Sequence, residues 1–162
     1  MKKIMYFLIL IFVLTSQRGY SQCNVQTIKK DGKIAKYLNP ELVGSAINCE
    51  IGLSFWKKGT SYWLSTTIRY LSSPKKTTGS LNIILKDGEY LELKFHSCDF
   101  ATVEKNRLLA ISLFEMTKLD VAKLKKTNIK SISFQETGGI SKVVSVSLNS
   151  EVAKRQLNCL NN

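Results

Sequence analysis

The chain has 162 residues but only one histidine, His96, and only two prolines. It lacks a nucleophile elbow, a phosphate-binding glycine loop and any cluster of metal ligands. Its twelve acidic residues are spread too thinly to indicate the paired carboxylates of a glycoside hydrolase. We therefore expect no metal, no cofactor and no catalytic residues, and we favour a non-enzymatic protein.

The sequence also lacks an apolar run long enough to span a bilayer. Its longest run, Ile4–Leu14, has eleven residues, whereas a transmembrane helix needs ~17–25. This run follows Lys2 and Lys3 and precedes a Gly-Tyr-Ser sequence ending at Ser21. A charged segment, an apolar segment and a small-x-small site form the pattern of a signal peptide. We predict that residues 1–21 are removed and that the protein is exported, to the periplasm or beyond.

Lipid anchoring at Cys23 fits the sequence less well than release after Ser21. A lipobox has a branched aliphatic residue three positions before the cysteine and a small residue directly before it. Tyr20 and Gln22 occupy these positions. The mature chain is therefore expected to begin at Gln22 without a lipid.

Residues 22–162 are expected to form a single domain. No stretch rich in proline, glycine or serine is long enough to be a linker, and no internal repeat is present. The whole chain carries a net charge of +12. Anionic glycans, lipid headgroups and other anionic cell-surface components or proteins are therefore candidate partners. The lysines, however, occur in scattered pairs that are typical of a solvated surface, and no motif is specific for nucleic acid.

Four cysteines lie in the predicted mature chain, at Cys23, Cys49, Cys98 and Cys159. An even number in an oxidising compartment predicts two disulfides, for which three pairings are possible. Loop length favours Cys23–Cys49 together with Cys98–Cys159, because these pairs close the shorter loops. A zinc site is not expected, since no two of the cysteines are close in sequence.

Alternation of apolar and polar residues dominates the mature sequence and predicts β-strands. We expect strands at 25–28, 33–38, 47–55, 62–70, 81–85, 91–95, 108–114, 129–135 and 140–148. Two short helices are expected, at 118–126 with Thr117 as N-cap and at 151–160 with Ser150 as N-cap. The pattern predicts a mainly β fold, an antiparallel β-sandwich of eight or nine short strands. The closing helix, hairpin and helix make an α+β fold the alternative.

Two hairpins have registers that the sequence restricts. The first can close through a two-residue loop at 58–59 or a four-residue loop at 58–61, and the second choice pairs Trp56 with Trp63. In the second hairpin, a two-residue Asp-Gly turn would bury a charge. A three-residue loop with Gly88 in the left-handed conformation instead pairs Ile83 with Leu91.

The first hairpin carries the main candidate for ligand binding. Trp56 and Trp63 occupy the face opposite the apolar one, with Lys57 and Lys58 at the tip. Two exposed indoles beside two ammonium groups suit a sugar ring, an anionic glycan or a peptide. The same tryptophans are also explained if they form a cross-strand pair or are covered by another segment.

His96 is expected on the solvent face of its strand, beside Glu92 and Lys94. Cys98 would share that face two residues later. Oxidation of Cys98 would remove the nucleophile, and no acid is placed to orient the histidine. We therefore interpret His96 as a surface residue.

The early Cys23 and the segments SYWLSTTIRY, LDVAKLKKTNIKSISF and QLNCL together resemble a small secreted domain of unknown function from Bacteroidota-type bacteria. The Gly-Tyr-Ser sequence before Gln22 resembles the export signals of such proteins. The resemblance covers the mature chain and implies export, but it implies no activity.

The sequence predicts a secreted, disulfide-containing binding or structural module. One alternative is an extracytoplasmic hydrolase, which a deep pocket around His96 or several carboxylates would favour. The other is a basic surface protein that binds anionic glycan or lipid through one contiguous basic face.

Overall fold

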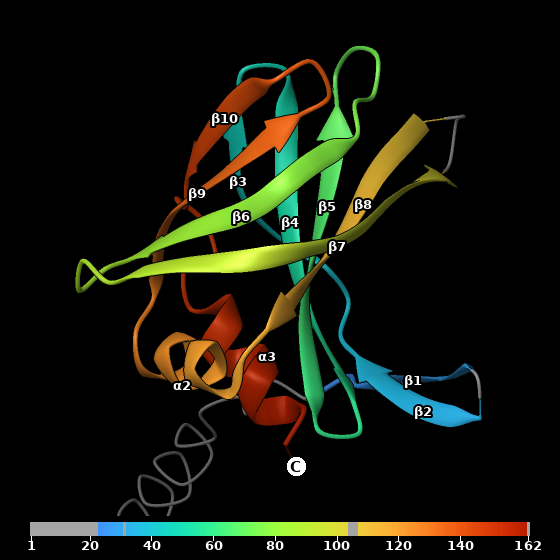
Figure 1. The fold of residues 1–162 in the computed structure, drawn as a ribbon, viewed down its shortest axis with the longest axis vertical. Helices are drawn as coiled ribbons and strands as arrows, with labels where there is room; N and C mark the ends of the chain where they lie inside the picture. Colours follow the sequence, from blue (N-terminus) through green and yellow to red (C-terminus); the bar gives the residue numbers. More distant parts are fainter. Residues whose placement is uncertain (1–22, 31, 104–106, 162) are drawn as a thin grey trace, which may run out of the picture.

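The structure, a computed structural model, describes residues 23–30, 32–103 and 107–161. The predicted signal peptide lies outside these residues. The described part contains ten strands and two helices (Figure 1). They are β1 (Gln26–Lys30), β2 (Lys33–Tyr37), β3 (Glu41–Ala46), β4 (Cys49–Lys58), β5 (Ser61–Tyr70), β6 (Thr77–Leu85), β7 (Tyr90–Val103), β8 (Arg107–Met116), α2 (Lys118–Lys126), β9 (Ile129–Glu136), β10 (Ile140–Ser145) and α3 (Val152–Cys159).

All ten strands belong to one antiparallel sheet with the order β1-β2-β4-β5-β8-β7-β6-β9-β10, and β3 pairs with β4. The long strand β7 connects the two layers of this sheet, because its first residues pair with β6 and the rest pair with β8. A β-bulge between Phe95 and Ser97 marks the change, and bulges bend a strand and increase its twist. The sheet therefore folds over so that β6 crosses β4 and β5, and β10 lies beside β3 (Figure 1). The predicted mainly β fold with two helices is confirmed.

The core lies between the two layers and follows the predicted alternation. On β4, Ile51, Leu53 and Phe55 are fully buried, and residues two apart on a strand point to the same face. Phe114 of β8 and Phe134 of β9 also lie in the core. Burial of these side chains supplies most of the driving force for folding, at ~25 cal/mol per Å² of apolar surface.

The local predictions are largely confirmed. The second hairpin pairs Ile83 with Leu91, and Gly88 has φ = 90°, as the three-residue loop requires. Helix α2 spans the predicted residues, and Thr117 and Asp120 form a reciprocal capping box at its start. In α3, however, Ser150 does not cap the helix: Glu151 occupies the N-cap position, without a side-chain bond.

Strand β3 was not predicted from the sequence, and it closes the fold. Val43 in β3 accepts backbone hydrogen bonds from Ser147 and Leu148, both at 3.1 Å. The approach is close, because a Cβ on Gly44 would lie 2.5 Å from the Ser145 carbonyl oxygen. The predicted strand at 140–148 is therefore too long at its end, since β10 stops at Ser145 and the last two residues bond to β3 instead of β9.

The disulfide also differs from the favoured pairing. Cys23 is bonded to Cys159 at the end of α3, with a Cα–Cα distance of 5.4 Å. Cys49 and Cys98 are free and buried. The predicted pairs Cys23–Cys49 and Cys98–Cys159 are thus wrong, because folding brings the beginning of the domain to α3 and places the other two thiols in the core.

Candidate ligand groove

The first hairpin, β4–β5, has the register predicted for the longer loop, but Lys58 itself pairs with Ser61, so only Gly59 and Thr60 form the loop. Phe55 pairs with Leu64 and Trp56 pairs with Trp63. Phe55 and Leu64 are fully buried between the layers, so alternation places both tryptophans on the outer face of the sheet. They are partly exposed there. The predicted separation of the two faces therefore holds.

Trp56 is held in place by neighbours on its own face. The Tyr37 ring of β2 stacks on it, with centroids 4.4 Å apart and an interplanar angle of 14°. Its indole nitrogen donates a hydrogen bond to Ser54 Oγ at 3.3 Å. These contacts fix the orientation of the indole before any ligand arrives.

The two tryptophans line a cavity of about 300 Å³, which we call the tryptophan groove. The hairpin β1–β2 extends from the edge of β4 and forms one side of it (Figure 1). Residues of strands β1, β2, β4, β5, β7 and β8 line the groove, although the Lys57 ammonium points to the other face of the hairpin. They are Ile28, Ala35, Trp56, Lys57, Lys58, Trp63, His96 and Leu113. All four residues predicted to contact a ligand are among them.

The two lysines at the hairpin tip have different roles. Lys57 Nζ donates hydrogen bonds to the Leu160 carbonyl at 3.4 Å and to Asn161 Oδ1 at 3.1 Å. Its ammonium is therefore held near the end of α3, on the face opposite the indoles. Lys58 is paired with Ala35 of β2 and alternates with Lys57, so it lies on the same face as the groove.

His96 lies at the groove beside an acidic residue that the sequence did not suggest. Its Nδ1 is 3.2 Å from Glu115 Oε1, and Lys94 Nζ is 3.9 Å from Glu115 Oε2. The His96 side chain is 52% exposed, as predicted. The bulge reverses the alternation after Phe95, so Cys98 turns into the core and does not share a face with the histidine.

A second group of polar side chains lies at the edge of the core. Glu136 is 1% exposed and lies 3.7 Å from Lys75 Nζ. Burial, followed by the adjacent Glu136 carboxylate, raises the pKa of Tyr70. Burial likewise raises the pKa of the Cys49 thiol. Glu136 and Cys49 are buried and Tyr70 is half-buried against the core, so we interpret this cluster as part of the folded structure.

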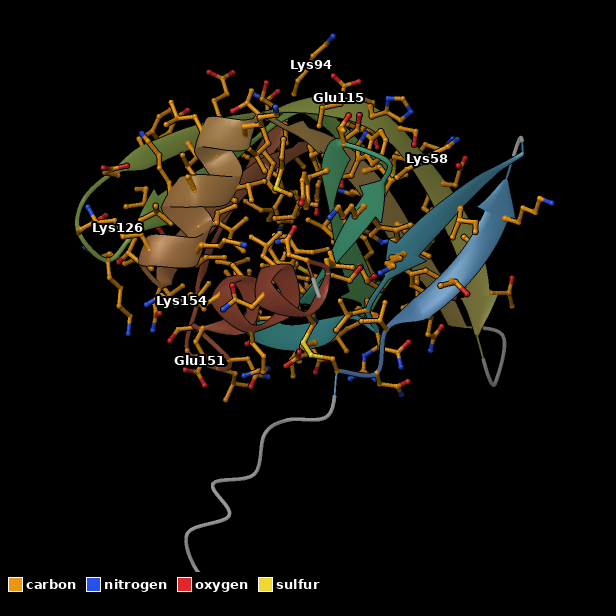
Figure 2. All side chains as sticks on the ribbon, turned by 90° about the horizontal axis from the view of Figure 1, so that it is seen from below. Lys58, Lys94, Glu115, Lys126, Glu151 and Lys154 are labelled. Atoms are coloured by element: carbon orange, nitrogen blue, oxygen red, sulfur yellow. A yellow bond between two sulfur atoms is a disulfide. The ribbon has the colours of Figure 1, made fainter. Side chains whose placement is uncertain are left out.

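The positive charge is distributed over several sides of the molecule. Figure 2 shows Lys58, Lys94 and Glu115 on one side of the molecule. Lys126 and Lys154 lie on a different side and point into solvent. Several other basic residues form ion pairs, such as Lys123 with Glu89 at 3.0 Å. The positive charge of the described residues is therefore not gathered on one contiguous face.

Neither a metal-binding cluster nor a membrane-spanning helix is found in the described part of the chain. Within residues 23–30, 32–103 and 107–161, no three His, Cys, Asp or Glu side chains are grouped so that they could hold a metal ion. None of the helices described there is both long and apolar enough to cross a membrane.

In comparisons with known proteins, no protein-family model, no curated protein and no solved structure matches the chain.

Proposed function

We propose that the protein is an exported, non-enzymatic binding module that holds a saccharide in the tryptophan groove. The observation that carries the proposal is the placement of Trp56 and Trp63 side by side on an outer face, in a mostly apolar cavity. Ligand sites are typically concave and apolar, with a few polar groups that fix orientation. An indole offers a flat apolar surface for the C–H face of a sugar ring.

Polar groups at the groove suit the hydroxyl groups of such a ligand. His96 lines the groove, and its imidazole can exchange hydrogen bonds with a hydroxyl. Glu115, which does not line the groove, lies 3.2 Å from the His96 ring and orients it. Lys58 adds a positive charge on the same face. The ligand that fits this combination best is a sugar with an acidic substituent.

The support beneath the groove favours binding without rearrangement. The backbone N–H of Phe55 donates to Gln156 Oε1 at 3.0 Å, and Lys57 ties the hairpin to the end of α3. A groove that is already ordered loses less conformational freedom when a ligand binds.

Export is part of the proposal. The predicted signal peptide supports it, and the bond between Cys23 and Cys159 is compatible with it, because structural disulfides persist mainly in oxidising compartments.

The test is a screen against neutral and acidic oligosaccharides, followed by calorimetry on variants. We expect Trp63→Ala to weaken binding of a hit at least about tenfold, since aromatic residues at the centre of a site dominate affinity. Tyr90→Ala is the matched control, because Tyr90 is 54% exposed and does not line the groove. Equal affinities for Trp63→Ala and the wild type would contradict the proposal.

A further inference from the structure

A second cavity, of about 350 Å³, lies between the tip of the β4–β5 hairpin, helix α2 and the end of α3. Lys57 and Tyr62, a cross-strand pair, form its hairpin side and alternate with the tryptophans. This space, which we call the basic cavity, is therefore on the other face of the hairpin from the groove. Its lining residues are Lys57, Gly59, Thr60, Tyr62, Lys118, Val121, Lys125 and Asn161.

Three ammonium-bearing side chains converge on this cavity from two elements. Lys118 and Lys125 are seven residues apart on α2, with Val121 between them, and this spacing places all three on one helix face. Lys57 comes from β4. The described residues that line the cavity include no aspartate or glutamate.

The hydrogen-bond acceptors of Lys57 are neutral. They are the Leu160 carbonyl and the Asn161 side-chain oxygen, and the ammonium also lies 5.4 Å from the centre of the Tyr62 ring. On helix α2, by contrast, Lys123 lies on another face and pairs with Glu89. The charges at the basic cavity are thus arranged without an acidic partner among the residues that line it.

Like charges around one cavity repel each other, and an anion between them reverses the sign of that interaction. Lysine binds phosphate and sulfate groups as a point charge, whereas bidentate recognition of a carboxylate typically uses arginine. A doubly charged oxyanion therefore fits three lysines better than a single carboxylate does.

We infer that the basic cavity binds a sulfate or phosphate group, carried as an ester on a polysaccharide. The anion site follows from Lys57, Lys118 and Lys125 alone. The polysaccharide carrier rests on the proposed function, because the tryptophan groove is on the same hairpin and would hold a neighbouring part of the chain.

The anion site is tested by NMR titration of the full mature chain with sodium sulfate at constant ionic strength. We expect saturable shifts of the Gly59, Thr60 and Val121 amides. Lys118→Ala with Lys125→Ala should weaken sulfate binding at least about tenfold, and alanine at these exposed or half-buried helix positions should preserve the fold. Lys126→Ala with Lys154→Ala removes the same charge elsewhere and should stay within about twofold of the wild type.

Equal loss in the two double variants, or no shift at Gly59, Thr60 and Val121, would overturn the site. The carrier is tested with a sulfated oligosaccharide and its desulfated form, and preference for the sulfated one is expected. Binding to vesicles containing phosphatidylglycerol but not to the sulfated oligosaccharide would overturn the polysaccharide assignment. Trp63→Ala should leave the titration with inorganic sulfate unchanged. The sulfate titration therefore tests the anion site independently of the tryptophan groove.

Discussion

At the scale of single residues, the groove depends on how its aromatic side chains are fixed. Trp56 is stacked by Tyr37 and bonded to Ser54, whereas Trp63 is its cross-strand partner on β5. The two indoles therefore act as a surface whose shape is set by β2 as well as by their own hairpin.

Removal of the stacking ring should loosen this surface. We expect Tyr37→Ala to lower the free energy of unfolding by about 1–3 kcal/mol, since the stacked pair contributes both buried area and ring-to-ring attraction. Tryptophan emission should shift to longer wavelength as Trp56 gains solvent. Chemical denaturation and fluorescence measure both effects, with Tyr90→Ala as the control, and unchanged emission of Tyr37→Ala would contradict the role given to Tyr37.

The half-buried Tyr70 and the buried Cys49 predict a loss of stability in alkali. Their ordinary pKa values are 10.0 and 9.0, and the fold raises both. The unfolded chain therefore releases these protons at lower pH than the folded chain, so the stabilisation is complete below about pH 9 and falls as the pH rises further.

Tyr70→Phe removes the phenol that titrates, and its stability should fall less steeply than that of the wild type above about pH 10. Urea denaturation at a series of pH values from about 7 to about 11 measures the two slopes. Parallel profiles for the variant and the wild type would show that Tyr70 does not contribute.

At the scale of elements, much of the fold could be predicted because local patterns decide it. Alternation indicated the faces of β4 and β5, and the turn around Gly88 fixed the register of the next hairpin. The strand β3 was missed because Glu-Leu-Val-Gly-Ser-Ala does not alternate and includes Gly44, which is needed for the close approach to Ser145.

The candidate site could be predicted only in part. Alternation placed Trp56 and Trp63 on one outer face, which the structure confirms. The other walls, such as Ile28 and Leu113, depend on how β1–β2 bends beside the sheet and on the pairing of β5 with β8. The contact between His96 and Glu115 depends on the β7–β8 register, and a bulge that no local pattern indicated sets this register.

The start of α2 offers a test of an element that the sequence predicted correctly. Thr117→Ala removes the capping box with Asp120 and should cost about 1 kcal/mol of stability. Lys126→Ala, at the other end of the same helix, is the control, because it leaves the N-terminal cap intact. Thermal unfolding of both variants measures the difference, and equal stabilities would contradict the role of the cap.

At the scale of the whole molecule, one covalent bond joins the two ends of the described domain. Cys23 and Cys159 are separated by 136 residues, so the bond restricts the unfolded chain strongly. Gln156 and Lys57 hold α3 to β4 independently of it. Reduction of the disulfide should therefore destabilise the protein without unfolding it.

We expect a reducing agent to lower the free energy of unfolding by about 2–4 kcal/mol. It should have no further effect on the Cys23→Ser, Cys159→Ser variant.

Peptide mapping without reduction checks the bond itself and should show Cys49 and Cys98 as free thiols and Gln22 as the first residue of the secreted chain. A Cys23–Cys49 peptide would contradict the structure, and a lipid on Cys23 would contradict release after Ser21.

Tryptophan fluorescence is the direct test of saccharide binding in the tryptophan groove. The chain contains two tryptophans and both line the groove, so every change in tryptophan emission reports from that site. Titration of the Trp56→Phe variant with an oligosaccharide from the screen should produce a saturable change in Trp63 emission, with the affinity found by calorimetry. Binding in the calorimeter with no change in Trp63 emission would place the ligand elsewhere and contradict saccharide binding in the groove.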